Sequence, residues 1–332
     1  MTDRGMTTIR VAAVQAQSLP GQIEVNLDHA AALVEQATAR GASIVVLPEL
    51  FSCGYVPNRA VWEAAEIRGG RTDRWLAATA SRLSIYLGAG AIETDGTDFF
   101  NMFALASPDG QIAGRAYKAN AEASIFRRGR AVHLIDTPAG RIGVGICADN
   151  QFAATLRLMH EQDADLVLMP HAWPTPARAA GLVSPADVAA QQQRMTELPV
   201  LYARALGVPV LFVNQVGPLL PIGGILGHLM DPRIWRLRGQ SRIVDCDGGV
   251  LGQLGDEEGV LTADVVMGPG RKHYEAQPGY GGWLQPGPWA GRHLIIPLDI
   301  AAGRLSYTIS RQRRRKARAA AERTNDPAGV TV

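Results

Sequence analysis

The 332-residue sequence has few cysteines, little net charge and no long uninterrupted apolar run. Its three cysteines are an odd number at wide spacing, which argues against a disulfide framework. The N-terminus lacks the basic start and apolar stretch of a secretory leader, so we expect a cytoplasmic protein with free thiols. The most apolar region, 198–230, is interrupted by Arg204, Asn214 and three prolines, and it therefore predicts no membrane span.

The charges nearly cancel, because 33 Lys and Arg stand against 31 Asp and Glu. Such a balance gives no overall field that would gather nucleic acid or an anionic membrane, so we expect neither as a partner. The seven histidines lie singly, without the spacing of a metal site, and the stretch 88–93 has only two of the three dinucleotide-binding glycines. We therefore expect a small-molecule partner, and neither a metal nor a nucleotide cofactor.

Short apolar runs alternate with segments of helical periodicity along most of the chain. This pattern predicts strands at 8–17, 42–50, 85–93, 141–147, 165–170 and 208–216, strand pairs within 101–118 and 241–253, and helices at 26–41, 73–84, 153–164 and 188–207. Strands alternating with helices predict an α/β sheet protein. No linker or repeat divides the chain, so we expect a single domain over 1–310.

The end of the chain, 311–332, is a basic, helix-prone run followed by a polar terminus. No aromatic side chains alternate with its arginines to stack on bases, so a nucleic-acid arm is the less favoured interpretation. We expect a tail that is either flexible or packed against a partner.

Three apolar stretches end at a reactive side chain: "IVVLPELF" at Glu49, "GRAYK" at Lys118 and "GVGIC" at Cys147. Sites in α/β proteins form where strands end. Apolar surroundings would weaken the solvation of Glu49 and make its carboxylate a competent base. Lys118, taken alone, has the pattern of an ordinary exposed lysine.

Cys147 lies between a strand pattern and a helix pattern, which predicts a sharp turn that presents the thiol. The first N–H groups of the following helix would favour the thiolate, the nucleophilic form. An isolated cysteine is more often a buried structural residue. Here Ala148 and then the polar residues Asp-Asn-Gln follow it, which a purely packed position would not require.

These stretches resemble the nitrilase, or carbon–nitrogen hydrolase, superfamily, whose signature is a Glu, a Lys and a Cys in that order. The resemblance runs from about Thr8 to Met267 through "RVAAVQAQ" and "VVLPELF", "AYKANAEASIFRRG", "GVGICADNQF" and "DADLVLMPHAW", with later echoes in "PVLFVNQVG" and "GQSRIVDCDGGVL". It implies a four-layer α-β-β-α sandwich that forms homodimers or larger homo-oligomers. It also implies that the fold holds no metal or organic cofactor.

The resemblance also implies roles for individual residues. Glu49 would take the proton of Cys147, whose sulfur would attack a carbon–nitrogen bond and form a thioester. Lys118 and the backbone N–H of Ala148 would hold the developing oxyanion. Members of the family commonly have a second glutamate that orients the lysine and the substrate, and Glu122 matches it.

The substrate is expected to be a carboxamide, hydrolysed to a carboxylic acid and ammonia, because Cys-Ala-Asp is more typical of amidases than of nitrilases. The small Ala148 leaves room beside the sulfur and favours an apolar or aromatic acyl group. The expected substrate-binding residues are Tyr55, Phe152, His171 and Trp173.

Several alternatives stay open at this point. The enzyme could be a nitrilase, or an N-carbamoyl amidohydrolase that uses Arg178 or Arg194 to bind a carboxylate. A catalytically silent binding or scaffold protein is the alternative from another class. The segment 217–239 is longer and more apolar than this connection usually is, and it could be a lid over the pocket or an oligomer contact.

Overall fold

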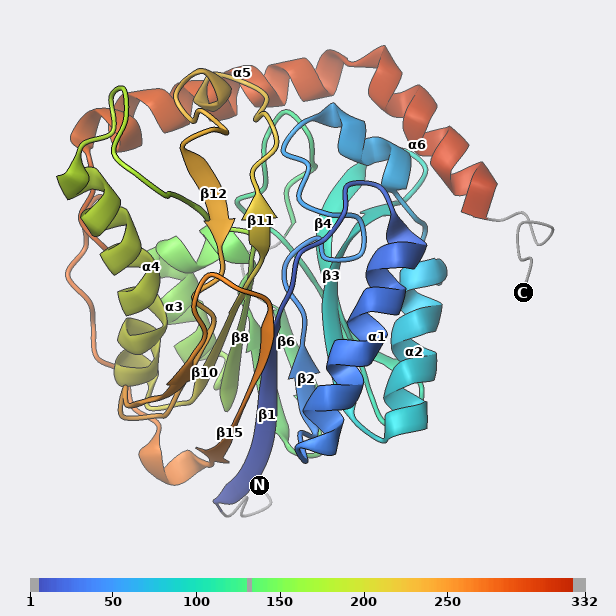
Figure 1. Ribbon diagram of the computed structural model, residues 1–332, viewed down its shortest axis with the longest axis vertical. Helices are drawn as coiled ribbons and strands as arrows, with labels where there is room; N and C mark the ends of the chain where they lie inside the picture. The colour runs from blue at the N-terminus through green and yellow to red at the C-terminus, as the bar shows by residue number, and fades with distance from the viewer. Residues whose placement is uncertain (1–5, 130–132, 325–332) are drawn as a thin grey trace.

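Two six-stranded sheets lie face to face, and helices cover the outer side of each sheet (Figure 1). The computed structural model describes residues 6–129 and 133–324. Helices α1 and α2 pack on one sheet, and α3 and α4 pack on the other. The expected four-layer α-β-β-α sandwich is therefore confirmed.

Each sheet combines a parallel centre with antiparallel edges. The first sheet has the order β15 (Gly259–Met267), β1 (Thr7–Gln15), β2 (Ile44–Val46), β3 (Tyr86–Thr94), β4 (Phe99–Ala106) and β5 (Ile112–Tyr117). The second has the order β14 (Val250–Gln253), β13 (Arg242–Val244), β10 (Val210–Asn214), β8 (Leu166–His171), β7 (Gly140–Val144) and β6 (His133–Thr137). A small third sheet has the order β11 (Val216–Pro218), β12 (Trp235–Arg238) and β9 (Pro174–Pro176).

The helices between the strands lie where the sequence predicts them, to within a few residues. The α-helices are α1 (Ile23–Ala39), α2 (Arg71–Leu83), α3 (Ala153–Glu161), α4 (Pro185–Leu206), α5 (Ile296–Ile309) and α6 (Arg311–Thr324). The short helices are η1 (Arg59–Ala64), η2 (Cys147–Gln151), η3 (Leu226–His228), η4 (Pro269–Arg271) and the π-helical turn η5 (Gly291–Ile295). Helix α5 was not predicted, because Pro297 and Gly303 interrupt its pattern. The proline falls in the first turn, where its missing N–H costs nothing.

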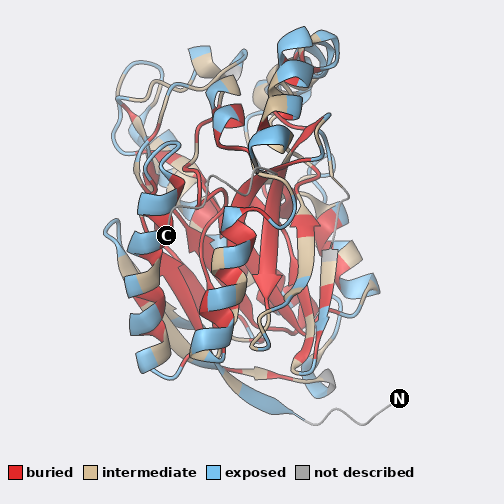
Figure 2. Ribbon diagram, turned by 90° about the vertical axis from the view of Figure 1, so that its right-hand side faces the viewer, coloured by how far each residue is buried: buried red, intermediate tan, exposed pale blue. Residues whose placement is uncertain are grey.

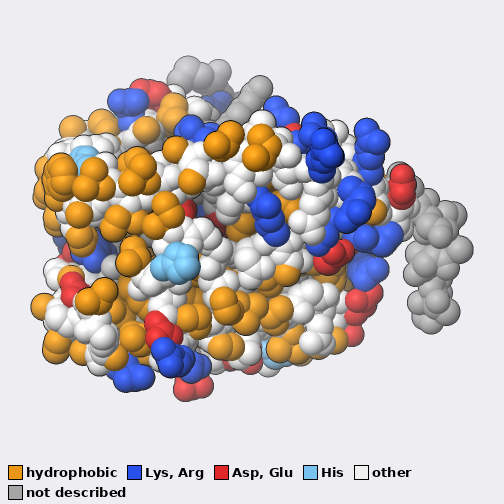
Figure 3. Space-filling view, turned by 90° about the horizontal axis from the view of Figure 1, so that it is seen from above, with side chains coloured by type: hydrophobic (Ala, Val, Ile, Leu, Met, Phe, Trp, Pro, Cys, Tyr) orange, Lys and Arg blue, Asp and Glu red, His pale blue; other side chains and the backbone are white. Residues whose placement is uncertain are grey.

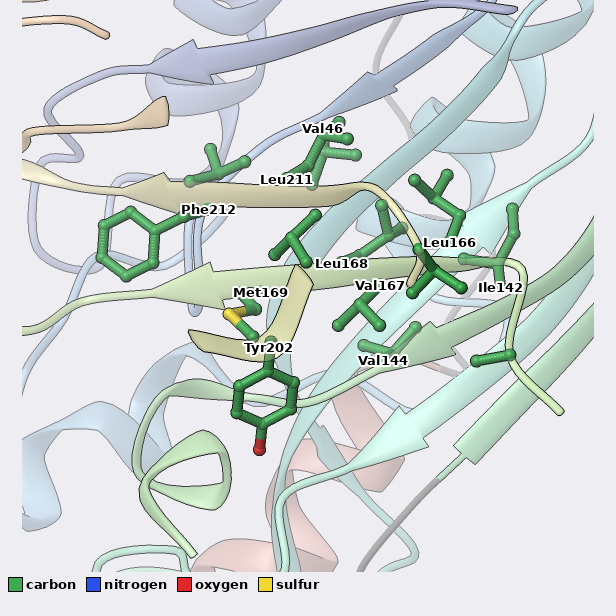
Figure 4. Packing of buried hydrophobic residues seen from close by; sticks show 14 of the residues in the cluster. Val46, Ile142, Val144, Leu166, Val167, Leu168, Met169, Tyr202, Leu211 and Phe212 are labelled. Atoms are coloured by element: carbon green, nitrogen blue, oxygen red, sulfur yellow. The ribbon is translucent and has the colours of Figure 1, made fainter. Parts of the chain in front are cut away.

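The core forms because consecutive residues of the central strands face opposite layers. In β1, Val11 and Ala13 pack between the two sheets, whereas Ala12 and Val14 pack under α1 and α2. Both faces are buried, which is why such strands read as continuous apolar runs. Figure 4 shows the second sheet's side of this core, and Figure 2 shows that burial is concentrated in the sheets.

Helices α5 and α6 cross one edge of the sandwich (Figure 1). Ala317 and Ala320 of α6 are fully buried, and Arg313 forms an ion pair with the buried Asp98. The part of the basic tail at 311–324 therefore packs one face on its own chain, and its other face is exposed. The remainder, 325–332, lies outside the described residues. Among the described helices, none is both long and apolar enough to cross a membrane.

The segment 217–239 packs beneath α5. It runs from β11 through η3 to β12, and the Ile225 N–H donates to Asp299 Oδ1 of α5 at 2.7 Å. Neither interpretation drawn from the sequence anticipates this contact within the chain. A cavity of about 390 Å³ lies between the segment, α5, the start of η1 at Arg59 and the loop at Ser124.

Candidate active site

Glu49 lies just beyond β2, and its side chain is fully buried. The chain turns sharply here, since Leu50 has a φ of 47°. Gly90 of β3 makes the turn possible, because a Cβ at this position would lie 2.2 Å from the backbone nitrogen of Leu50. The side chain of Gln215 donates from Nε2 to the Glu49 carbonyl at 2.6 Å. The backbone of the proposed base is thus fixed from two sides.

The Glu49 carboxylate accepts three hydrogen bonds. Lys118 Nζ lies 2.7 Å and Asn101 Nδ2 2.8 Å from its Oε1, and the Ala172 N–H donates to Oε2 at 2.8 Å. Lys118 Nζ also lies 3.0 Å from Glu122 Oε1. The structure therefore joins three of the predicted residues into one buried network.

Among the described residues, Lys118 has partners for two of its three donors. An ammonium group has three N–H donors, and Glu49 and Glu122 take two of them. Burial lowers the pKa of Lys118, but the charges of Glu122 and Glu49 outweigh burial and hold the pKa well above its usual value. The group is a permanent cation with a donor to offer, as stabilisation of an oxyanion requires.

Cys147 occupies a strained turn. It has a φ of 48°, in the left-handed region that a side chain rarely adopts. Asn150 Nδ2 donates to the Gly145 carbonyl at 2.6 Å, and Gly145 has no room for a Cβ, which would lie 1.9 Å from Asn150 Oδ1. The predicted sharp turn is therefore present, although the short helix η2 separates Cys147 from α3.

The expected thiolate is wrong for the resting site. Burial raises the pKa of Cys147 well above its usual value, the charge of Glu49 raises it further, and Lys118 offsets only part of this. Two carboxylates and one ammonium already leave a net negative charge in the site, so a thiolate would add a second. Transfer of the thiol proton to Glu49 avoids this, because it leaves the charge of the site unchanged.

The four predicted substrate-binding residues have different environments. Tyr55 donates from its hydroxyl to Glu122 Oε1 at 2.9 Å, and Trp173 is 8% exposed. Phe152 is half-buried and its ring packs on Trp283.

His171 is the most deeply buried of the four. It is fully buried and stacks between Trp173 and Phe212, and its Nε2 lies 3.1 Å from Asn150 Nδ2. Burial holds the pKa of His171 well below its usual value, so the ring is neutral. Through Asn150 it supports the turn around Cys147, and its role in substrate binding stays a prediction.

The family model described as carbon-nitrogen hydrolase matches residues 10–271. The chain belongs to the carbon-nitrogen hydrolase family. The matched residues contain all the predicted site residues, so the resemblance inferred from the motifs is confirmed at the level of the family. Helices α5 and α6 lie beyond the matched residues.

Relatives named as amidases and nitrilases are similar to half of the chain or more. The omega-amidase NIT2 of Xenopus tropicalis is 29% identical over 275 residues, which cover 79% of this chain and 90% of the relative. The bifunctional nitrilase/nitrile hydratase NIT4B of Lupinus angustifolius is 30% identical over 190 residues, which cover 50% of this chain and 54% of the relative.

Solved structures of the carbon-nitrogen hydrolase family share the fold. The carbon-nitrogen hydrolase of Helicobacter pylori G27 superposes with a TM-score of 0.68 at 25% identity, covering 78% of this chain and 89% of that chain. Nit3 of Saccharomyces cerevisiae, at 23% identity, has a TM-score of 0.63 and covers 77% of this chain and 89% of its own. The latter likeness shows the fold alone.

Sequence reasoning missed three groups that hold the site of this carbon-nitrogen hydrolase together. Asn101 and the Ala172 N–H bind the Glu49 carboxylate, and Gln215 binds its backbone. Two of them had a sequence signal, since Asn101 interrupts the apolar strand "FFNMFALA" and Gln215 ends the apolar strand "VPVLFVNQ". A buried polar side chain in an apolar strand needs a partner. The backbone N–H of Ala172 has no such signal.

Two further observations concern other ways in which the site could catalyse a reaction: a second cysteine nucleophile and a metal ion. Burial raises the pKa of Cys53 to about 12, and its side chain is fully buried, which makes it a poor second nucleophile. Within the described residues, no group of three or more His, Cys, Asp and Glu side chains could hold a metal ion.

Proposed function

We propose that this carbon–nitrogen hydrolase is an amidase, which converts a carboxamide to a carboxylic acid and ammonia with Cys147 as nucleophile. One observation carries the proposal: a buried lysine joins Glu49 and Glu122 beside the buried thiol of Cys147. The network supplies a base, a cation and a nucleophile without a titrating histidine.

In the first half of the reaction, Glu49 accepts the Sγ proton of Cys147 as the sulfur attacks the carbonyl carbon. The carbonyl oxygen becomes an oxyanion, which accepts hydrogen bonds from Lys118 Nζ and the Ala148 N–H. Ala148 is the second residue of η2, whose first N–H groups have no partner within the helix. Glu49 then returns the proton to the nitrogen, the carbon–nitrogen bond breaks and ammonia leaves.

In the second half, water replaces ammonia. Glu49 takes a proton from the water, whose oxygen attacks the thioester carbon, and the same oxyanion donors hold the second tetrahedral intermediate. The carbon–sulfur bond breaks, and the proton on Glu49 returns to Cys147. The acid leaves, and the site is restored.

Glu122 favours an amide over a nitrile. Its Oε1 is held by Lys118 and Tyr55, whereas its buried Oε2 has no partner among the described residues. Burial raises the pKa of Glu122, but the Lys118 charge together with hydrogen bonds from the backbone, Lys118 and Tyr55 lowers it below the usual value, so the group is a carboxylate that accepts hydrogen bonds. A carboxamide has an N–H to donate to Oε2, and a nitrile has none. The similarity to the omega-amidase supports the same choice.

A matched pair of substrates tests the proposal. We expect a higher kcat/KM for benzamide than for benzonitrile, measured as ammonia release. Glu122→Gln keeps the size of the side chain, and it should reduce the amide rate more than the nitrile rate because it weakens acceptance of the amide N–H. Faster acid formation from benzonitrile would make the chain a nitrilase. No turnover of either, with no thioester in the intact mass, would favour the silent binding protein.

We further propose that the acyl group is apolar or aromatic, with Tyr55 and Trp173 as its first contacts, and that the enzyme is a cytoplasmic homo-oligomer. The small Ala148 beside the sulfur supports the preference for such an acyl group, and the free cysteines support the cytoplasmic location. A series of amides of increasing acyl length, and sedimentation of the purified chain, test these points separately.

A further inference from the structure

The segment from Trp289 to Thr324, here called the cap, forms one face of the molecule. It contains η5, α5 and α6 and runs along the top edge of both sheets (Figure 1). Viewed onto this face, hydrophobic side chains gather over one part and Lys and Arg side chains over the part near α6 (Figure 3). The two kinds of side chain occupy separate, adjoining areas.

The apolar part is a stripe along α5. Leu298 is 60% exposed and Leu305 64%, although both are large aliphatic side chains. The stripe follows helical spacing and consists of Leu294, Leu298, Leu305 and Ile309, with the exposed Trp289 before it and Ile225 and Leu229 of the neighbouring segment beside it. The opposite side of α5 is the one that packs on the body, since Gly303 and Tyr307 are buried. A contiguous exposed patch of this kind marks an interaction surface.

The basic part follows directly on α6. Its exposed arginines are Arg311, Arg314, Arg315 and Arg318, and none of them forms an ion pair within the described chain. Arg313 and Lys316 point the other way, to Asp98 and Glu63 of the body. The helix thus uses its inner cations to attach to the protein and leaves its outer cations unpaired.

The cap differs in charge from the rest of the molecule. Between Trp289 and Thr324 the sequence has nine Lys and Arg against two Asp and Glu, whereas the whole chain has 33 against 31. The body therefore carries an excess of acid, and the net charge of +2 averages over two regions of opposite sign. An anionic surface would attract the cap and repel the body, which orients the molecule with the cap facing it.

We propose that the cap docks the protein on an anionic lipid bilayer, with α5 lying in the plane of the interface. An interfacial helix needs an apolar face to enter the boundary between headgroups and acyl chains, and nearby cations to attract acidic headgroups. The cap supplies both. Nucleic acid would not use the aliphatic stripe, and a second copy of the chain would bring a second set of unpaired arginines to the same contact.

Docking by this face would bring the candidate active site close to the bilayer. Arg59 donates to Ser306 of α5 and, from Nε, to the Ser124 carbonyl at 3.2 Å. Ser124 lies two residues beyond Glu122. The helix that would lie on the lipid is therefore tied directly to the loop that carries a site residue.

Vesicle co-sedimentation of the full chain tests the proposal. We expect binding to vesicles of phosphatidylcholine with phosphatidylserine, little binding to phosphatidylcholine alone, and weakening as salt rises. The double variant Arg314→Gln/Arg318→Gln should bind about tenfold or more weakly, since one surface arginine contributes about fivefold. Leu298→Glu/Leu305→Glu should bind little even at low salt.

Matched controls separate a specific surface from general effects. Arg74→Gln/Arg82→Gln removes the same charge from exposed positions of α2, and Leu182→Glu changes an aliphatic side chain that is 94% exposed outside the cap. Both should bind as the unmodified chain does. Three results would overturn the proposal. The α2 double variant could weaken vesicle binding as much as Arg314→Gln/Arg318→Gln does, the chain could bind equally to both kinds of vesicle, or Leu298→Glu/Leu305→Glu could bind as the unmodified chain does. A dimer that this last variant converts to monomers would overturn it too, because the cap would then be an interface between copies.

Discussion

In the proposed mechanism, the charges around Lys118 decide how Cys147 becomes a nucleophile. The fully buried ammonium is shared by Glu49 and Glu122, and the thiol nearby has a pKa raised first by burial and then by Glu49. The raised pKa favours a neutral thiol in the resting site, so the proposed mechanism requires the carboxylate of Glu49 to accept its proton during attack. A nucleophile that is activated only when substrate is bound is protected from oxidation between turnovers, because the thiolate is the reactive form.

The first prediction concerns these three residues. Cys147→Ala should abolish hydrolysis while circular dichroism shows the fold intact. Glu49→Gln and Lys118→Ala should each lower kcat by about 10²-fold or more, as when a general base or an oxyanion donor is lost. Cys246→Ser is the control and should retain activity. Unchanged rates in Cys147→Ala would move the nucleophile to Cys53.

Asp149 provides a second prediction, through the dependence of stability on pH. Its carboxylate accepts hydrogen bonds from the Ala119 N–H at 3.1 Å and from Asn120, which holds the chain just after Lys118 against the turn of Cys147. Burial nevertheless raises the pKa of Asp149 from 3.8 to about 6. The folded state therefore binds this proton more tightly than the unfolded state does.

The stabilisation from the Asp149 proton is complete below about pH 4 and is lost as the pH rises through about 6. We expect the free energy of unfolding of the native chain to fall by about 3 kcal/mol relative to Asp149→Asn over this window, at about 1.4 kcal/mol per pKa unit. Urea unfolding of both proteins across the range measures the difference. Parallel curves for the two proteins would contradict the raised pKa.

Among the elements, α6 shows how a basic segment can be structural on one side and free on the other. Arg313 and Arg127 both contact the carboxylate of Asp98, which is 3% exposed. The buried alanines on the same side of α6 let the helix approach the body closely. The part of the basic, helix-prone tail at 311–324 is thus a packed helix of the fold.

The third prediction separates the two sides of α6. Arg313→Ala should lower the free energy of unfolding by about 2–3 kcal/mol, less than the about 3–5 kcal/mol of a broken buried pair because Arg127 still neutralises Asp98. Arg314→Ala changes the exposed neighbour and should stay within about 0.5 kcal/mol. Denaturant midpoints give both values. Equal effects of the two substitutions would mean that α6 does not dock through Arg313.

At the scale of the whole molecule, the two sheets share one core. Side chains of β1 and β2 from the first sheet, such as Val11 and Val46, belong to the same cluster as Leu168 and Leu211 of the second. Neither sheet can bury its inner face without the other. We therefore expect the sandwich to unfold as a unit.

The fourth prediction tests this cooperativity. Thermal unfolding followed by far-ultraviolet circular dichroism and by tryptophan fluorescence should give coincident transitions. Leu168→Ala, which leaves a cavity in the fully buried core, should destabilise by about 2–5 kcal/mol and shift both probes together. Two separated transitions would instead divide the chain into independent units.

The sequence by itself determined the family and most of the central strands and helices, and it pointed to the candidate site residues, but it did not predict β6, β9, β12, β15 or α5. What it determined depends on local patterns: apolar periodicity, and the reactive residues Glu49, Lys118 and Cys147 at the ends of apolar strands. Lys118 shows the limit of such patterns, since taken alone it has the appearance of an exposed lysine.

Only the tertiary structure decided the protonation of Cys147, the burial of His171, the partners of Glu49 and the place of the cap. Each depends on segments far apart in the chain, as when Ala172 and Asn101 meet at one carboxylate or α5 covers loops from the first half of the sequence. A residue's charge state depends on the total burial and charge around it. Whether a face of a helix is exposed depends on which other elements pack against that helix. Neither is a property of neighbouring residues in the sequence.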